Sequence, residues 1–315
     1  MDLMFTLAGL ALLVGAGDAL VRGAVALSLK LGVSVLVISL TVVAFGTSAP
    51  ELFVGVQAAL DDADGIVMGN VVGSNIANVL LVLGVPAMIS GIETKDCDCR
   101  RSWLIMIGAS LLFIGLCAVG PLTVWHGLLL LTVLGWMLTD TWRESRNDPT
   151  AAADLEELED VDPTMATWKV AALLAAGVVG LPLGAHLLIE GARGVAMAYG
   201  LTEAAVGLTL VAVGTSLPEL MTSISAALRR EADVAMGNVI GSNIFNILGI
   251  MGVSSLVAPI SVAPEFLSLD LWVMLAASAL IGVCLYPRWR LGRLAGLAFI
   301  ALYVLFAVAV LGPRI

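Results

Sequence analysis

Two short motifs place an acid beside hydroxyl-bearing residues inside apolar stretches. GTSAPE occupies residues 46–51 and GTSLPE occupies residues 214–219, so Glu51 and Glu219 end the two motifs. A charged side chain at the middle of a membrane-spanning helix costs about 2.5–3.5 kcal/mol to insert, and such a residue is functional by default. Two carboxylates with hydroxyl groups beside them can bind a cation that has lost its water. The structural alternative is a proline-kinked packing helix whose acid faces a neighbouring helix.

The residues around each acid supply further oxygen atoms. Pro50 and Pro218 have no N–H, so the carbonyls of Gly46 and Gly214 lose their helical partners. In lipid, a freed carbonyl must be satisfied by an opposing helix or by a bound cation. Hard cations such as Ca²⁺ and Na⁺ prefer oxygen ligands. We therefore expect the neighbouring hydroxyl groups to be ligands: Thr47, Ser48, Thr215 and Ser216.

A second repeated block supplies amide and hydroxyl groups. GNVVGSNIANVLLVLG spans residues 69–84, and GNVIGSNIFNILGIMG spans residues 237–252. In each block a Ser and an Asn lie one helical turn apart on the same face, which predicts the ligands Ser74, Asn78, Ser242 and Asn246. The remaining amides are expected to divide between capping, interhelical hydrogen bonds and ion contact: Asn70, Asn75, Asn238 and Asn243.

The composition indicates an all-α polytopic membrane protein. Apolar residues make up 60% of the chain and charged residues 13%, whereas a soluble domain is roughly 45–50% apolar and about 25% charged. Several apolar runs approach or reach the ~20 residues that cross a bilayer as a helix. The net charge of −10 includes an acidic cluster within residues 144–162, which reads as a solvated connector. A basic patch of the kind that binds nucleic acid is absent.

The chain repeats itself in opposite membrane orientations. The halves align without a gap at an offset of 168 from residue 23 to residue 84. We predict ten transmembrane helices, five in each half: 3–29, 33–60, 66–90, 102–120 and 122–142, then 168–198, 202–228, 234–258, 270–287 and 291–312. An odd number of spans in each half inverts the second copy, as in many secondary transporters.

The basic residues give the predicted orientation. If the N-terminus faces outside, thirteen of the fifteen Lys and Arg residues fall in inner connectors, as the positive-inside rule requires. We therefore expect a first five-helix repeat over 1–142, a short acidic cytoplasmic connector over 143–167 and an inverted repeat over 168–315. Both termini would then lie outside.

Both paired blocks resemble the α-repeats of the cation/Ca²⁺ exchanger superfamily, and the GTSxPE motif resembles that of its Na⁺/Ca²⁺ exchangers. The resemblance covers nearly the whole chain. It implies a prokaryotic-type exchanger in the cell (inner) membrane, in which Glu51 and Glu219 ligate Ca²⁺ and share their site with Na⁺. It also implies the hydroxyl and amide ligands given above and the backbone of Ala44 and Ala212. Some relatives have Asp where this chain has Asn246, which argues against K⁺ dependence.

The predicted function is secondary active antiport of Na⁺ against Ca²⁺ by alternating access at a shared site. The first helices of the two halves are expected to slide across the others. The sequence predicts no enzyme activity, no cofactor and no obligate protein partner; Na⁺, Ca²⁺ and the lipid bilayer are the expected partners. The nearest alternative is H⁺-coupled Ca²⁺ exchange, because protons also compete for a desolvated carboxylate. A passive channel and an intramembrane serine hydrolase, with Ser48 or Ser216 beside His186, are more remote alternatives.

Five other residues carry weaker predictions. Asp18 and Arg22 are one helical turn apart, which predicts a helix-end ion pair, with part of a gate as the alternative. His186, the repeat-mate of Asp18, is expected to be a packing residue, with a proton relay as the alternative. Cys97 and Cys99 are expected to be free thiols, with metal binding as the alternative.

Overall fold

The computed structural model describes residues 2–94, 97, 99–147, 165–198, 214–285 and 290–311. These residues are helical almost throughout, which confirms the all-α prediction. Two isolated antiparallel bridges join Ile92 to Leu291 and Leu122 to Ile260, so each bridge ties a connector of the first half to one of the second.

The first half begins with one long helix and continues with two broken ones. The long helix is α1 (Asp2–Leu31). The first broken helix consists of α2 (Val35–Ile38), the π-helical turn η1 (Ser39–Val43), α3 (Ala44–Thr47) and α4 (Ala49–Leu60). The second consists of α5 (Asp64–Ala77), η2 (Asn78–Val82) and α6 (Gly84–Ile89). Two uninterrupted helices follow, α7 (Arg100–Val119) and α8 (Val124–Asn147).

The second half follows the same order. Its long helix is α10 (Thr167–Ala198), and its first broken span is described from residue 214 onward and contains α13 (Leu217–Leu228). The next comprises α14 (Ala232–Ile244), η4 (Phe245–Ile250) and α15 (Met251–Val257). The last elements are η5 (Phe266–Asp270), α16 (Leu271–Leu285) and α17 (Arg293–Leu311).

Among the described residues, seven helical stretches are long and apolar enough to cross a membrane, and the bent pair Val35–Thr47 and Ala49–Leu60 makes an eighth if it is one span. α17 is apolar but shorter over its qualifying part, Arg293–Ala309. Much of the predicted span 202–228, and most of the predicted connector 143–167, lie outside the described residues. The structure therefore establishes a polytopic helical membrane architecture, within which the ten-span count stays a prediction.

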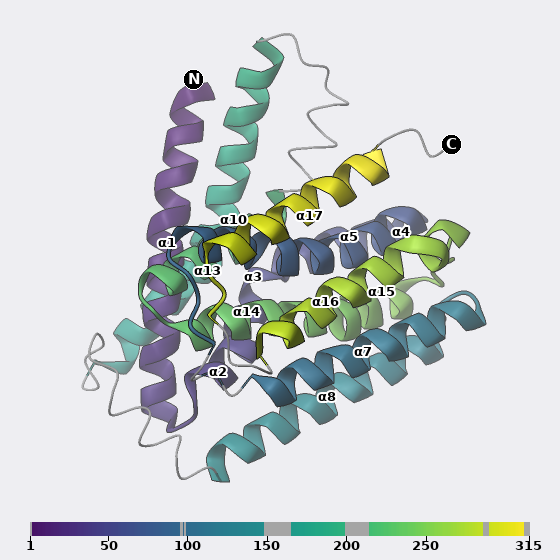
Figure 1. Cartoon of the computed structure of the whole chain (residues 1–315), viewed down its shortest axis with the longest axis horizontal. Coiled ribbons are helices and arrows are strands. Elements are labelled where there is room, and N and C mark those ends of the chain that lie inside the picture. Colours follow the sequence, from purple (N-terminus) through teal and green to yellow (C-terminus); the bar gives the residue numbers. More distant parts are fainter. Residues whose placement is uncertain are drawn as a thin grey trace.

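α1 and α10 form a pair that crosses the other helices (Figure 1). Glycines let their backbones approach closely, as small residues do in membrane helix pairs. A Cβ atom at Gly9 would lie 2.5 Å from the Leu188 amide nitrogen, and one at Gly184 would lie 3.0 Å from that of Leu13. A Cβ at Gly177 would lie 2.5 Å from the Cβ of Leu20. The pair is therefore packed backbone to backbone along most of its length.

The two spans that carry the GSN blocks form the centre of the molecule. In the most apolar window of Ala232–Val257, 83% of residues are buried, and in that of Asp64–Ile89 72% are buried, against 33% for Asp2–Leu31. The most polar blocks of the sequence thus occupy the most enclosed helices. In membrane proteins, polar groups face the bundle interior because lipid cannot hydrogen-bond them.

Asp18 has a different main partner from the predicted one. Arg229, at the end of α13, donates two hydrogen bonds to its carboxylate, and the bond from Nε measures 2.7 Å. The predicted partner Arg22 is 3.9 Å away. The helical spacing correctly placed Arg22 nearby, but it could not reveal that α13 crosses α1 at this level. Asp18 therefore links the α1–α10 pair to the rest of the protein.

The prediction of free thiols at Cys97 and Cys99 is wrong, because the structure joins them in a disulfide. Their Cα atoms are 5.3 Å apart, within the range of about 4.4–6.8 Å that a disulfide requires. Cys117, which is buried, and Cys284, which is half-buried, are free.

The α1–α10 contact predicts opposite effects for two substitutions on the same helix. Gly9→Ala places a methyl group against the Leu188 backbone, and overpacking of this kind costs about 1–3 kcal/mol. Gly15→Ala meets no atom within 4 Å, so it is expected to be neutral or to stabilise the helix by about 0.5–1 kcal/mol. Thermal unfolding in detergent measures both. Equal unfolding midpoints would contradict the close contact.

The ion pair between α1 and α13 predicts a measurable coupling. The two side chains are 39% and 26% exposed for Asp18 and Arg229, so solvent screens the pair and we expect about 0.5–1 kcal/mol of coupling. A double-mutant cycle of Asp18→Asn and Arg229→Gln, read by thermal unfolding, gives this value. Arg230→Gln, which changes the exposed neighbouring arginine, is the matched control and should leave the midpoint unchanged.

Candidate functional site

The first GTS motif lies at a break between two helical segments, and the second lies directly before α13. Ser48 leaves the helical conformation (φ −86°, ψ 8°), and the chain bends by 49° between the segments on either side of it. Ser216 has nearly the same conformation (φ −87°, ψ 5°) just before α13. Each proline follows in the first turn of the new helix, where its missing N–H is tolerated. The acids Glu51 and Glu219 therefore also lie in first turns.

The two carboxylates are buried inside the helical bundle. Each glutamate is 1% exposed. Ser48 donates a hydrogen bond to Oε1 of Glu219 at 3.0 Å, which joins the two halves at the site. Oε2 of Glu51 and Oε2 of Glu219 have no hydrogen-bond partner among the described residues. Neither acid forms a salt bridge within the described part of the chain.

A matching asparagine holds the backbone at each acid. Asn70 donates from Nδ2 to the carbonyl oxygen of Glu51 at 3.0 Å, and Asn238 donates to that of Glu219 at 3.2 Å. These two asparagines are related by the offset of 168, so the same hydrogen bond holds the glutamate backbone in both repeats. The sequence leaves several roles open for these amides, and the structure shows interhelical hydrogen bonds.

Thr47 lies between the two halves. Its hydroxyl group is within 3.2 Å of both the Ala44 carbonyl oxygen and Oδ1 of Asn238, and within 3.5 Å of Oγ of Ser242. Of the remaining predicted ligands, Ala44, Ser74, Ser242 and Ser216 are buried and Thr215 is half-buried. Ala212 lies outside the described residues.

Five buried oxygens of the predicted set have no hydrogen-bond partner among the described residues. They are Oε2 of Glu51, Oε2 of Glu219, Oγ of Ser216, Oδ1 of Asn78 and Oδ1 of Asn246. Two other such hydroxyls, those of Ser254 and Ser255, lie on α15 outside this set. A buried polar atom without a partner costs about 1–3 kcal/mol. Several such oxygen atoms in one predicted set, all able to act as electron-pair donors to an ion, are what a cation site requires.

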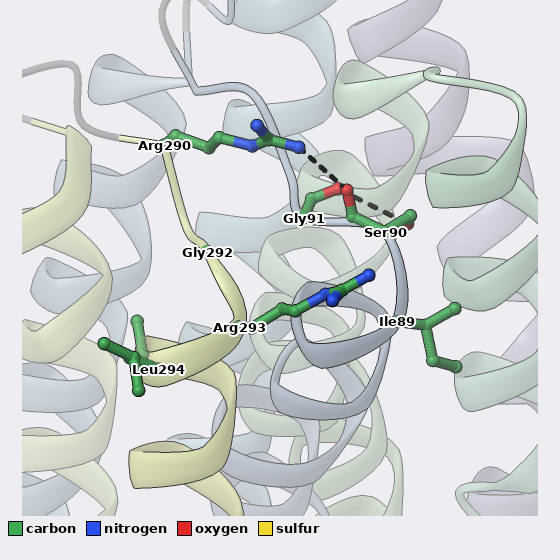
Figure 2. A pocket seen from close by; sticks show the side chains of 8 residues that line it. Ile89, Ser90, Gly91, Arg290, Gly292, Arg293 and Leu294 are labelled. Atoms are coloured by element: carbon green, nitrogen blue, oxygen red, sulfur yellow. Dashed lines mark hydrogen bonds between the residues drawn. The ribbon is translucent and has the colours of Figure 1, made fainter.

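Two other features of the structure do not belong to this cluster. His186 is exposed on α10, whereas Ser48 and Ser216 are buried, so the Ser–His pair of the hydrolase alternative is not assembled. A surface hollow of about 660 Å³ lies between the end of α6 and the start of α17. Arg290 and Arg293 line it (Figure 2), and their positive charge makes it unsuitable for cations.

Comparison with known proteins gives consistent matches along the chain. The sodium/calcium exchanger protein family matches residues 2–139 and 169–312. The sodium/calcium exchanger MaX1 of Methanosarcina acetivorans is 33% identical, over 98% of this chain and 97% of its own. The inner membrane protein YrbG of Escherichia coli is 34% identical over 89% of this chain and 87% of its own.

Solved structures of the sodium-calcium exchanger NCX_Mj have the same fold. One, soaked with 2.5 mM Na⁺ and 0.1 mM Ca²⁺, gives a TM-score of 0.82 at 32% identity and covers 100% of this chain and 99% of its own. Another, soaked with 10 mM Na⁺ and 10 mM Sr²⁺, gives 0.81 at 31% identity over the same shares.

Proposed function

This chain belongs to the sodium/calcium exchanger family, and we propose that it is an antiporter that exchanges Na⁺ for Ca²⁺ at one shared site. The membership makes it a membrane transporter of cations and not an enzyme. The coupling ion, the site residues and the alternating-access mechanism are the parts that we propose.

The observation that carries the proposal is the set of buried oxygens without partners around Glu51 and Glu219. Burying an ionised carboxylate is costly unless a counter-charge or hydrogen bonds compensate it. A bound cation supplies both the missing charge and the missing contacts. We assign the site to the twelve predicted ligands. Five are the residues whose buried oxygens have no partner, the two acids among them. The other seven are Thr47, Thr215, Ser48, Ser74, Ser242, Ala44 and Ala212.

Charge counting explains why the two ions would exclude each other. Two carboxylates neutralise one Ca²⁺ or two Na⁺, and a third Na⁺ would have to bind to neutral oxygens. Both ions need the same Glu51 and Glu219 side chains, so one must leave before the other binds. Exchange of three Na⁺ for one Ca²⁺ would move one net charge, whose energy changes by about 2.3 kcal/mol per 100 mV.

The proposed transport cycle uses the inverted repeat. The ten predicted spans place the two acids at equivalent points of oppositely oriented halves, as in other transporters with inverted repeats. The α1–α10 pair, which crosses the remaining helices (Figure 1), is the element that we propose slides to open the site to each side in turn. In the proposed orientation the protein lies in the cell (inner) membrane. Both termini are then outside, and the acidic connector is in the cytoplasm.

The two acids give the first functional test. Glu51→Gln and Glu219→Gln each remove one negative charge while keeping the side-chain shape, so each should abolish Na⁺-dependent ⁴⁵Ca²⁺ uptake into proteoliposomes. Glu265→Gln, at an exposed glutamate, is the matched control and should retain uptake. Transport that survives in both site variants would remove the proposed site.

A second experiment identifies the coupling ion. Proteoliposomes loaded with Na⁺ and diluted into Na⁺-free buffer should take up Ca²⁺ and generate a membrane potential. Vesicles with a pH gradient but no Na⁺ should take up none above background. Uptake driven by the pH gradient alone would establish H⁺-coupled exchange, the alternative in which protons occupy the same carboxylates.

A further inference from the structure

Four asparagines of the two GSN blocks form two reciprocal hydrogen bonds between the halves. Asn78 donates from Nδ2 to Oδ1 of Asn243 at 3.1 Å, and Asn246 donates from Nδ2 to Oδ1 of Asn75 at 3.1 Å. The offset of 168 converts one bond into the other. All four side chains are at most 1% exposed, so water does not compete for these bonds.

The direction of each bond is fixed by the accepting asparagine, because its own Nδ2 already donates to another group. Asn243 uses its Nδ2 to donate to the backbone carbonyl oxygen of Asn75 at 3.2 Å, and a carbonyl can only accept. The Oδ1 of Asn243 is therefore the atom that faces Asn78, and it requires a donor. Asn75 similarly directs its Nδ2 to the sulfur of Met274 at 3.5 Å, which leaves its Oδ1 for Asn246.

This arrangement determines which end of the Asn78 and Asn246 amides is free. Asn78 and Asn246 direct their NH₂ groups to the opposite half, and their Oδ1 atoms are two of the five orphan oxygens. An amide turned by 180° would present two N–H donors in place of that oxygen. Such donors would repel a cation, so the same residue would oppose binding.

We propose that Asn75 and Asn243 are positioning residues, which fix the amide orientation of Asn246 and Asn78 so that oxygen faces the transported cation. They do not ligate the ion themselves. This inference rests on the proposed function, because it assumes that the orphan oxygens of the site receive a cation.

A carboxylate at position 246 supplies the discriminating test. Both of its ends are oxygen, so it needs no neighbour to choose its orientation, and the Oδ1 of Asn75 becomes an unfavourable neighbour instead. Asn75→Leu removes the acceptor and keeps a side chain of similar size. It leaves the backbone carbonyl that Asn243 uses. If Asn75 had only a structural role, its replacement would weaken cation binding equally with Asn or with Asp at position 246.

The experiment is a double-mutant cycle of Asn75→Leu and Asn246→Asp in the full chain. Apparent affinities for Ca²⁺ and for Na⁺ are taken from the cation-dependent rise of the thermal unfolding midpoint. We expect Asn75→Leu to weaken Ca²⁺ binding roughly tenfold when residue 246 is Asn, and less than about twofold when it is Asp. Thermal unfolding without cations verifies that each variant folds.

Two results would overturn the inference. Equal losses of affinity in both backgrounds would make Asn75 a structural residue, and no loss in either would remove its influence on the site. If Asn75→Leu does not fold, Asn75→Ser, which keeps a smaller polar group, takes its place in the cycle. A native chain that binds neither cation would overturn the proposed function itself, whereas native binding with a flat cycle would overturn only the positioning role.

Discussion

Two buried carboxylates that have no counter-charge among the described residues are the constraint on which the rest of this structure depends. Glu51 and Glu219 are almost fully buried. An isolated charge in a low-dielectric interior is so costly that real proteins pair it, neutralise it or bind a metal ion. Neither acid has a basic partner in the described part of the chain. In the proposed function, the transported cation supplies the missing charge.

The repeats show how one set of contacts stabilises this arrangement twice. The asparagine bond to the glutamate carbonyl and the cross-repeat amide pair each occur in both halves. Other contacts break the symmetry. Ser48 donates to Glu219, while Oγ of its repeat-mate Ser216 has no partner among the described residues. Two halves of an alternating-access transporter must differ in any one state, since only one side is open. The unequal hydroxyl contacts are consistent with that requirement.

The sequence predicted the helical membrane architecture and the clustering of the polar residues because both follow from local rules. Apolar length predicts spans, and Pro50 and Pro218 predict the breaks, since proline cannot continue a helix without losing a hydrogen bond. The offset of 168 predicts which residues are equivalent. Burial of the polar blocks follows from lipid, which cannot satisfy them.

The remaining features depend on contacts between distant segments. The helical spacing of Asp18 and Arg22 predicted a local pair, and only the crossing of α1 and α13 places Arg229 closer. The four GSN asparagines were assigned to several roles because an amide has both a donor and an acceptor end, and spacing does not distinguish them. The end of Asn78 that faces the site is set by Asn243 on the other half of the chain, whose own Nδ2 donates to the Asn75 carbonyl oxygen.

The π-helical turns connect this local detail to the site. η2 begins at Asn78, and η4 contains Asn246, so a wide turn occurs at the same point of both repeats. π-helical turns are rare, and they occur frequently at functional sites because they rotate the following side chains out of the α-helical phase. Ser74 and Asn78 share a face only while the helix between them is regular, as it is up to Ala77. The irregular turn thus begins at the last predicted ligand of the first repeat, Asn78, and one residue before that of the second, Asn246. The residues that follow are free to pack as apolar core without being constrained by the site.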